Sequence, residues 1–487
     1  MTGIEARSGL DAWKDADLPQ PPTPTGFGWL GVVGPGVIVL GASIGGGEFL
    51  LGPAAFVRYG FSLLWVTLVA VFLQTVFNTE LMRYTVATGE PVFTGFMRTK
   101  PSATIWAWVY SIVFFLQMGW PGWAANAAAA AFFLFWRKLP GAADAGTVFV
   151  IGIATYLVCV AILLVGRRIE RTLEILNAIL ITCILGSFLV LAVVYVPLSV
   201  WISATAGYVG YDTANSTFDF LPKGADFVLL GALVGFSGAG GVGNIVLSNW
   251  ARDRGYGMGQ RVGYIPAAVG GKHVNLAHTG FIFSPNADEM KKWRGWWRVV
   301  RADQWGVFFI GAVAGMALPA LLYVRFIPRG SDIRGLGIAA ALAEGIGAYA
   351  GPLLAGVIAF LGVWLLFKSQ LDILEGMTRA LTDILWTGSK RLRAWRGGDV
   401  RAVYYSVLGV TVVWGIVALR LVQPIMLLQI SANVASAVFI GASLHLLYIN
   451  TRLLPVELRP PMWRRISLVV MSVFYAFFFF LSVRAIV

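Results

Sequence analysis

Cysteine and histidine are scarce in this chain. Of its 487 residues, two are cysteine and three are histidine. Cys159 and Cys183 both lie in apolar stretches, which excludes a disulfide framework and suits packing within helices. His273, His278 and His445 form no cluster with cysteine or paired carboxylates, which are the groups that catalysis inside a membrane usually needs. We therefore expect neither an enzyme nor a cofactor.

Charge is also low. Charged residues make up 13% of the chain and hydrophobic residues 58%, with a mean hydropathy of +0.75. A soluble protein carries roughly 25% charged residues. Apolar runs of about 20 residues recur along the chain, and this is the length that a helix needs to cross a bilayer. The runs are continuous and not alternating, which excludes a transmembrane barrel. The sequence predicts an all-α polytopic membrane protein.

The apolar runs predict about eleven spanning helices. Their approximate ranges are 27–57, 61–86, 103–136, 147–166, 173–202, 226–250, 304–327, 339–367, 402–421, 423–449 and 464–485. With the N-terminus inside, 28 of the 37 Lys and Arg fall in inner segments, which predicts an N-in, C-out topology in the plasma (inner) membrane. The net charge of +13 thus comes from connecting loops, so we expect the lipid bilayer, and not nucleic acid, as partner.

The order of the segments suggests a division of the chain. Residues 1–26 are polar and proline-rich and lack an apolar core, which predicts a disordered cytoplasmic tail. Two five-helix repeats at 27–203 and 204–449 follow, and 450–487 adds helix 11. Because five is odd, the repeats would insert with opposite topology.

A glycine-rich stretch interrupts the first apolar segment. Gly45, Gly46 and Gly47 each weaken a helix by about 1 kcal/mol relative to Ala, and Glu48 follows them directly. A carboxylate near the bilayer midplane costs roughly 2.5–3.5 kcal/mol and is a candidate functional group. Glu48 could coordinate a hydrated cation, pair with an organic cation or carry a proton. Alternatively, it could cap a half-helix through backbone N–H groups.

A second glycine-rich stretch lies at the matching position of the second repeat, at residues 235–244. We expect Gly240, Gly241, Gly243 and Asn244 to contribute to a solute site with the first stretch. Paired discontinuous helices 1 and 6 in an inverted repeat point to a midplane site in a secondary transporter. The alternative is that these glycines only allow close helix packing.

Several motifs resemble those of the Nramp family of metal transporters. They are Gly34-Pro35-Gly36, Tyr59-Gly60-Phe61-Ser62-Leu63-Leu64-Trp65-Val66, Leu73-Gln74, Ala87-Thr88-Gly89, and Asn244 with the Ile-Val-Leu-Ser that follows it. The resemblance implies a LeuT-like fold with a 5+5 inverted repeat and transport of divalent transition metals, usually with protons.

The chain departs from the family at the metal site. The family's Asp-Pro-Gly-Asn in helix 1 reads Gly45 to Glu48 here, and its Met-Pro-His-Asn in helix 6 reads Gly241 to Asn244. The soft Met ligand, which favours transition metals over hard ions, is therefore absent. Residues 103–136 also contain no Asp or Glu for proton relay. Glu48 and Asn244 remain as candidate metal ligands.

Other polar residues in apolar segments have ordinary explanations. We expect Lys368, Gln370 and Asp372 at the inner end of helix 8, where a lysine can extend to the interface. Glu80 and Arg83 are spaced for a salt bridge within one helix.

Two functions therefore remain open. The first is Nramp-like secondary transport, by alternating access, of a small cation such as a divalent metal ion, hydrated Mg²⁺ included. The alternative is a carrier for a small organic solute, an amine or an amino acid, on the same scaffold. The oligomeric state stays open.

Overall fold

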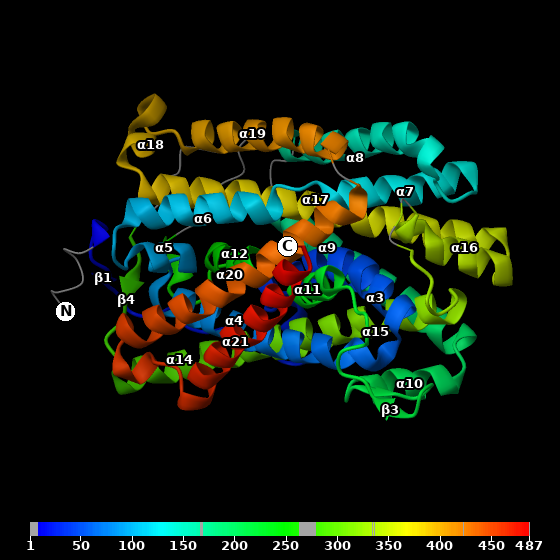
Figure 1. Ribbon diagram of the computed structural model, residues 1–487. Helices are drawn as coiled ribbons and strands as arrows, with labels where there is room; N and C mark the ends of the chain where they lie inside the picture. Colours follow the sequence, from blue (N-terminus) through cyan, green and yellow to red (C-terminus); the bar gives the residue numbers. More distant parts are fainter. Residues whose placement is uncertain are drawn as a thin grey trace.

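The computed structural model describes residues 8–165, 169–262, 279–333, 335, 337–421 and 423–486. His273 and His278 lie outside these ranges. The described chain is an elongated bundle of helices, with the N-terminal segment at one end and helices α10 and α16 at the other (Figure 1).

Helices make up nearly all of the described chain. The α-helices are α2 (Pro35–Gly46), α3 (Gly52–Tyr59), α4 (Leu64–Thr88), α5 (Val92–Met97), α6 (Ala103–Met118), α7 (Gly122–Trp136), α8 (Ala145–Val165), α9 (Ile169–Tyr195), α10 (Leu198–Gly207), α11 (Phe227–Gly235), α12 (Val242–Asp253), α13 (Gly259–Val262), α14 (Ala287–Arg301), α15 (Ile310–Phe326), α16 (Ile338–Ala350), α17 (Pro352–Gly388), α18 (Lys390–Ala394), α19 (Val400–Leu421), α20 (Pro424–Arg452) and α21 (Met462–Ile486). Two π-helical segments, η2 (Gly47–Leu51) and η5 (Ala302–Phe309), join α2 to α3 and α14 to α15. Short 3-10 turns are η1 (Gly26–Gly31), η3 (Phe61–Leu63), η4 (Ala142–Asp144), η6 (Trp395–Gly397) and η7 (Val456–Leu458).

Among the described residues, nine helical spans are long and apolar enough to cross a membrane. They are Pro35–Tyr59, Phe61–Thr88, Ala103–Trp136, Ala142–Leu164, Ala287–Phe326, Pro352–Gly388, Val400–Leu421, Pro424–Arg452 and Met462–Ile486. Each corresponds to one of the eleven expected segments. The two other segments correspond to α9 and to the broken pair α11 and α12. The helical membrane class is confirmed.

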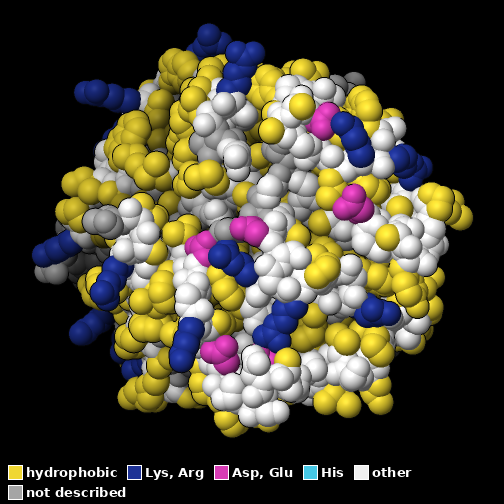
Figure 2. All heavy atoms as spheres, turned by 45° about the vertical axis from the view of Figure 1, so that its right-hand side comes forward, with side chains coloured by type: hydrophobic (Ala, Val, Ile, Leu, Met, Phe, Trp, Pro, Cys, Tyr) yellow, Lys and Arg dark blue, Asp and Glu magenta, His cyan; other side chains and the backbone are white. Residues whose placement is uncertain are grey.

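The packing is layered. Helix α17 contacts α2, α6, α7, α8 and α19. In Figure 1, α8 and α19 form an outer layer beyond α7 and α17. Figure 2 brings the end with α10 and α16 forward: hydrophobic side chains are spread over this face, acidic side chains lie among them, and basic side chains lie both near the middle and along the margin.

Helix 8 differs from the expected range 339–367. The chain forms the separate helix α16, turns at Gly351 with φ of 92°, and begins α17 at Pro352. Helix α17 then continues to Gly388, because its polar second half is buried against other helices and not exposed to lipid. Lys368, Gln370 and Asp372 therefore lie in the middle of α17, and their expected position at its inner end was wrong.

The N-terminal segment also differs from the expected disordered tail. From residue 8 onward it lies along one end of the bundle, where β1 (Lys14–Asp15) pairs in parallel with β4 (Phe281–Ile282). The Leu18 side chain is buried, and its amide donates to the Glu289 carboxylate at 2.7 Å. Burial of an apolar side chain offsets the entropy lost by ordering this segment. A second pair, β2 (Tyr211–Asp212) with β3 (Thr217–Phe218), is antiparallel and lies at the opposite end.

Candidate functional site

The first expected interruption takes the form of a π-helical turn. Residues Gly47–Leu51 form η2 between α2 and α3, and the backbone stays in the right-handed helical region at Gly46 and Gly47. Such turns inside α-helices are frequently found at functional sites. Helix 1 is thus interrupted where the sequence predicts it, although it is not unwound there.

The three glycines before Glu48 allow very close packing. A Cβ on Gly47 would lie 1.7 Å from the Phe236 carbonyl oxygen, and one on Gly45 would lie 2.3 Å from Ser369 Oγ. A Cβ on Gly46 would lie 3.0 Å from Trp123 Nε1. Helix 1 therefore contacts the helix 6 break and α17 at distances that favour glycine alone, whereas at Gly46 the Trp123 side chain of α7 would need to shift by only a few tenths of an ångström.

Glu48 is buried in this packing. Its side chain has no solvent exposure, and neither carboxylate oxygen accepts a hydrogen bond from the described residues. The backbone N–H groups of Glu48 and Gly238 and the Ser43 hydroxyl approach the carboxylate, but none reaches ordinary hydrogen-bond distance and angle. The Ser43 hydroxyl donates instead to the Leu40 carbonyl at 2.8 Å. A buried carboxylate without a donor is costly, so a proton or a cation is the natural partner of this group.

The second interruption is an unwound segment. Helix α11 ends at Gly235 and α12 begins at Val242, with positive φ at Gly238 (115°), Gly240 (74°) and Gly241 (48°). These angles favour glycine because it lacks a Cβ. Helix 6 is therefore discontinuous, as the sequence predicts.

Two glutamines hold the unwound segment. Gln74 of α4 donates to the Ser237 carbonyl at 2.8 Å. Gln117 of α6 donates to the Gly240 carbonyl at 3.0 Å and accepts from the Val242 amide at 2.9 Å. Irregular backbone at membrane depth needs such partners, because no water is there to replace them. The sequence reasoning did not assign this role to either glutamine.

Asn244 lies on the first turn of α12 and points to another helix. Its side-chain amide donates to Asn78 Oδ1 of α4 at 2.9 Å, and its own Oδ1 accepts no hydrogen bond from the described residues. Since the Glu48 oxygens have no hydrogen-bond donor, Asn244 is not bonded to Glu48. Within the described ranges, no group of three or more His, Cys, Asp or Glu could hold a metal ion.

A small cavity lies between the interrupted helices. It measures about 30 Å³ over the positions open to the centre of a water molecule, which is room for one or two waters. Its walls include Ser43 of α2, Trp123 of α7, Phe236 of the helix 6 break and Asp372 of α17.

Three of the expected site residues line this cavity and five do not. The lining residues are Gly46, Gly47 and Gly243. Those outside the lining are Gly45, Glu48, Gly240, Gly241 and Asn244. Glu48 is nevertheless adjacent in sequence to the lining residue Gly47. The cavity and the buried carboxylate are therefore neighbours, not one continuous pocket.

Asp372 is a cavity residue that the sequence reasoning missed. Its carboxylate pairs with Lys368 Nζ at 2.6 Å, and both side chains are at most 2% exposed. The i,i+4 spacing of these two charges was the signal for a pair within one helix. An expected helix end at residue 367 places the pair outside the bundle core, whereas α17 continues to Gly388 and buries it.

A buried charge network lies further along the two helices that form the cavity wall. Arg252 of α12 pairs with Asp253 at 2.7 Å and with Asp383 of α17 at 2.9 Å. Arg379 of α17 pairs with Glu375 one turn away and with Asp253 at 3.3 Å. The network joins α12 to α17 on one side of the cavity, so opening that side requires these ion pairs to separate.

Comparison with known proteins supports the fold. No protein-family model and no curated protein sequence matches this chain. Among solved structures, a mutant of the Eremococcus coleocola manganese transporter is similar, with a TM-score of 0.63 and 15% identity over 98% of this chain and 90% of the other. MhsT in complex with L-phenylalanine has a TM-score of 0.50 and 13% identity, over 95% of this chain and 100% of the other. Both are LeuT-fold transporters, and this chain has that fold.

Proposed function

We propose that this chain is a secondary transporter that moves a small cation across the membrane by alternating access. The observation that carries the proposal is Glu48, a fully buried carboxylate without a hydrogen-bond donor among the described residues. It lies on the interrupted helix 1, next to the cavity wall at Gly47. In a LeuT-type fold, interrupted helices near the midplane are where solutes bind.

A hard, hydrated divalent cation suits this chain better than a bare transition metal. Glu48 and Asn244 offer oxygen ligands, and neither thioether nor imidazole stands at the matching positions of helices 1 and 6. Hard cations such as Mg²⁺ prefer oxygen ligands and retain several waters. The protein would thus be an Nramp-like carrier with altered ion preference, in the plasma membrane with its N-terminus inside.

The chemistry of the cavity lining favours a second candidate, a small organic cation, for which the cavity of about 30 Å³ would have to widen. Trp123, Phe236 and Trp250 line the cavity together with Asp372. Aromatic faces and a carboxylate are the groups that bind organic ammonium ions. One of the similar structures, that of the Eremococcus coleocola manganese transporter, was determined in complex with an aromatic bis-isothiourea compound. In that case Asp372, and not Glu48, would meet the charged group, and its ion pair with Lys368 would have to open first.

Uptake into proteoliposomes tests both candidates. Mg²⁺, Mn²⁺ and phenethylamine are offered in turn to wild-type protein, to Glu48→Gln and to Glu344→Gln, which changes an exposed carboxylate on α16. The cation proposal expects saturable Mg²⁺ uptake that Glu48→Gln abolishes and Glu344→Gln retains. Metal uptake that survives Glu48→Gln would refute the role of Glu48. Uptake of phenethylamine alone, reduced in Trp123→Leu, would favour the second candidate.

A pH gradient across the same vesicles tests proton coupling. Helices α6 and α7 contain no Asp or Glu that could relay protons. We therefore expect little difference in metal uptake with and without the gradient. Strong stimulation by the gradient would show that a group outside α6 and α7, such as Glu48, carries the proton.

A further inference from the structure

A basic groove runs between the end of α20 and the beginning of α21. It has a volume of about 570 Å³ and is open on one side. Three arginines form its polar end: Arg452 on α20, Arg459 on the connection, and Arg465 on α21. The groove lies at the end of the bundle where most of the Lys and Arg are expected to face the cytoplasm.

The guanidinium groups of these arginines have spare donors. Arg465 Nε donates to the Pro460 carbonyl at 2.7 Å, and Arg459 Nε donates to the Leu454 carbonyl at 3.1 Å. These bonds orient the side chains and leave the terminal nitrogens for a ligand. In the part of the chain that the structure describes, none of the three forms an ion pair, not even with Glu457 on the same connection.

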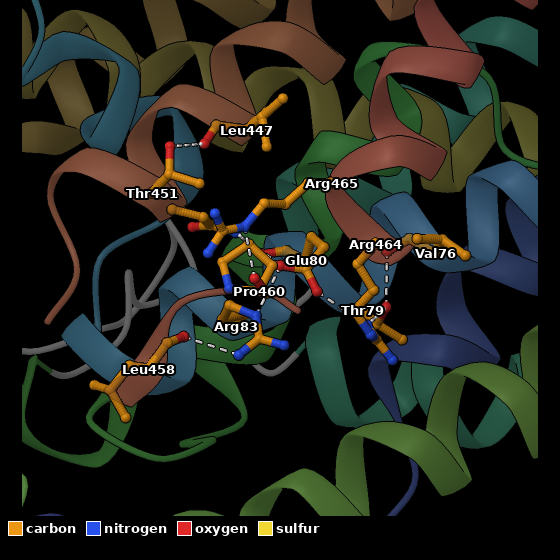
Figure 3. Close-up of polar contacts among 11 residues, drawn as sticks. Val76, Thr79, Glu80, Arg83, Leu447, Thr451, Leu458, Pro460, Arg464 and Arg465 are labelled. Carbon is orange, nitrogen blue, oxygen red and sulfur yellow. Dashed lines mark hydrogen bonds and ion pairs between the residues drawn. The ribbon is translucent and has the colours of Figure 1, made fainter. Parts of the chain in front are cut away.

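The neighbouring Arg464 shows the contrast. It turns inward, where it is 4% exposed and pairs with Glu80 of α4 at 3.0 Å. Glu80 also pairs with Arg83 at 2.7 Å, as the sequence predicts. In Figure 3, Arg464 lies on the side of Thr79, whereas Arg465 lies on the side of Pro460 and Thr451. The inward arginine is thus neutralised by protein and the outward ones are not.

The other end of the groove is apolar and exposed. Ile466, Val469 and Val470 of α21 line it and are 43–55% exposed, and Met462 at the helix start is 65% exposed. Their spacing places them on one stripe of the helix, along the flank that we expect to face lipid. Free phosphate would use the arginines but not this stripe.

We propose that this groove binds an anionic phospholipid of the inner leaflet. The phosphate would accept bidentate hydrogen bonds from the arginines, and an acyl chain would lie along the apolar stripe. Basic pockets between membrane helices on the cytoplasmic side bind such headgroups. Bound lipid would also hold the start of α21, where Arg464 reaches Glu80, against α4.

The proposal is tested by native mass spectrometry of the purified full chain with phosphatidylglycerol, phosphatidylcholine or inorganic phosphate. The test variant replaces Arg452, Arg459 and Arg465 with Gln. Its control replaces Arg391, Arg393 and Arg396, which removes equal charge from the connection between α17 and α19. Three arginines near a headgroup predict phosphatidylglycerol binding roughly a hundredfold weaker in the test variant, and little changed in the control.

Several outcomes would overturn the proposal. They are equal retention of phosphatidylcholine, equal losses in the two triple variants, and displacement of lipid by millimolar phosphate. Loss of lipid together with dissociation of a dimer would show that the groove is an interface between two copies. If the triple variant misfolds, Arg452→Gln replaces it, because this exposed side chain makes no hydrogen bond or ion pair among the described contacts. Unchanged lipid binding in Arg452→Gln would then count against the proposal.

Discussion

Replacing Gly47 with alanine tests whether the glycine-rich stretch exists for close approach. The added Cβ would lie 1.7 Å from the Phe236 carbonyl oxygen, whereas ordinary contact begins near 3.4 Å. The two backbones must therefore separate by about 1.7 Å. That movement would also strain the hydrogen bond from Gln74 to the adjacent Ser237 carbonyl, now 2.8 Å long.

The expected cost follows from both effects. Overpacking costs about 1–3 kcal/mol, and a buried carbonyl without its donor costs about 1–3 kcal/mol more, so we expect a loss of roughly 2–6 kcal/mol. Thermal unfolding in detergent, followed by tryptophan fluorescence, measures this as a lowered midpoint. The matched control is Gly441→Ala in α20, where a Cβ would meet nothing within 4 Å and should be neutral or stabilising by up to about 1 kcal/mol. Equal midpoints for Gly47→Ala and wild type would refute the close-approach argument.

Three further predictions concern polar groups. Gln117→Leu removes both hydrogen bonds to the helix 6 break, so we expect destabilisation by about 2–6 kcal/mol and faster amide hydrogen exchange at residues 240–242. Asp372→Asn leaves Lys368 buried without its counter-ion and should cost about 3–5 kcal/mol, whereas the double change with Lys368→Met should recover most of it; equal midpoints of the single and double variants would count against the pair. Burial by itself raises the pKa of Glu90, but the charge and hydrogen bonds of Arg98 outweigh burial and hold that pKa below its usual range. The stabilisation is therefore present above about pH 4.3, where the unfolded carboxyl is ionised, and is lost as pH falls through the folded pKa, so acid titration of Glu90→Gln should lack this loss.

The two interruptions could be placed from the sequence because glycine content and an intramembrane carboxylate are local signals. The backbone conformation of each interruption could not be predicted from the sequence. Gly45 to Gly47 and the stretch around Gly240 look alike in sequence, yet the first stays helical and the second unwinds. The difference arises from partners on other helices: Phe236 and Ser369 pack directly on the first stretch, whereas Gln74 and Gln117 satisfy the exposed backbone of the second.

Asp372 shows why the cavity wall was only partly predicted. A hydropathy pattern alone does not show whether a charged side chain faces lipid or protein. A charge facing lipid is costly, so the sequence predicts Lys368 and Asp372 at a helix end. In the structure both are covered by protein and neutralise one another in mid-helix. The N-terminal segment was likewise mispredicted from local composition. Its polar sequence predicts disorder, but contacts with the distant helix α14, such as the hydrogen bond from the Leu18 amide to Glu289, hold it in place.

The sequence by itself determined the membrane class, the approximate positions of the helices and the places where helices 1 and 6 are interrupted. These features depend on composition and periodicity over about 20 residues, so each can be read from a single segment without its neighbours. Only the tertiary structure decided which side chains share the cavity, which charges are paired and where Glu48 lies without a donor. The physical reason is that burial and pairing depend on segments more than 100 residues apart, such as Gly47 against Phe236 and Arg464 against Glu80.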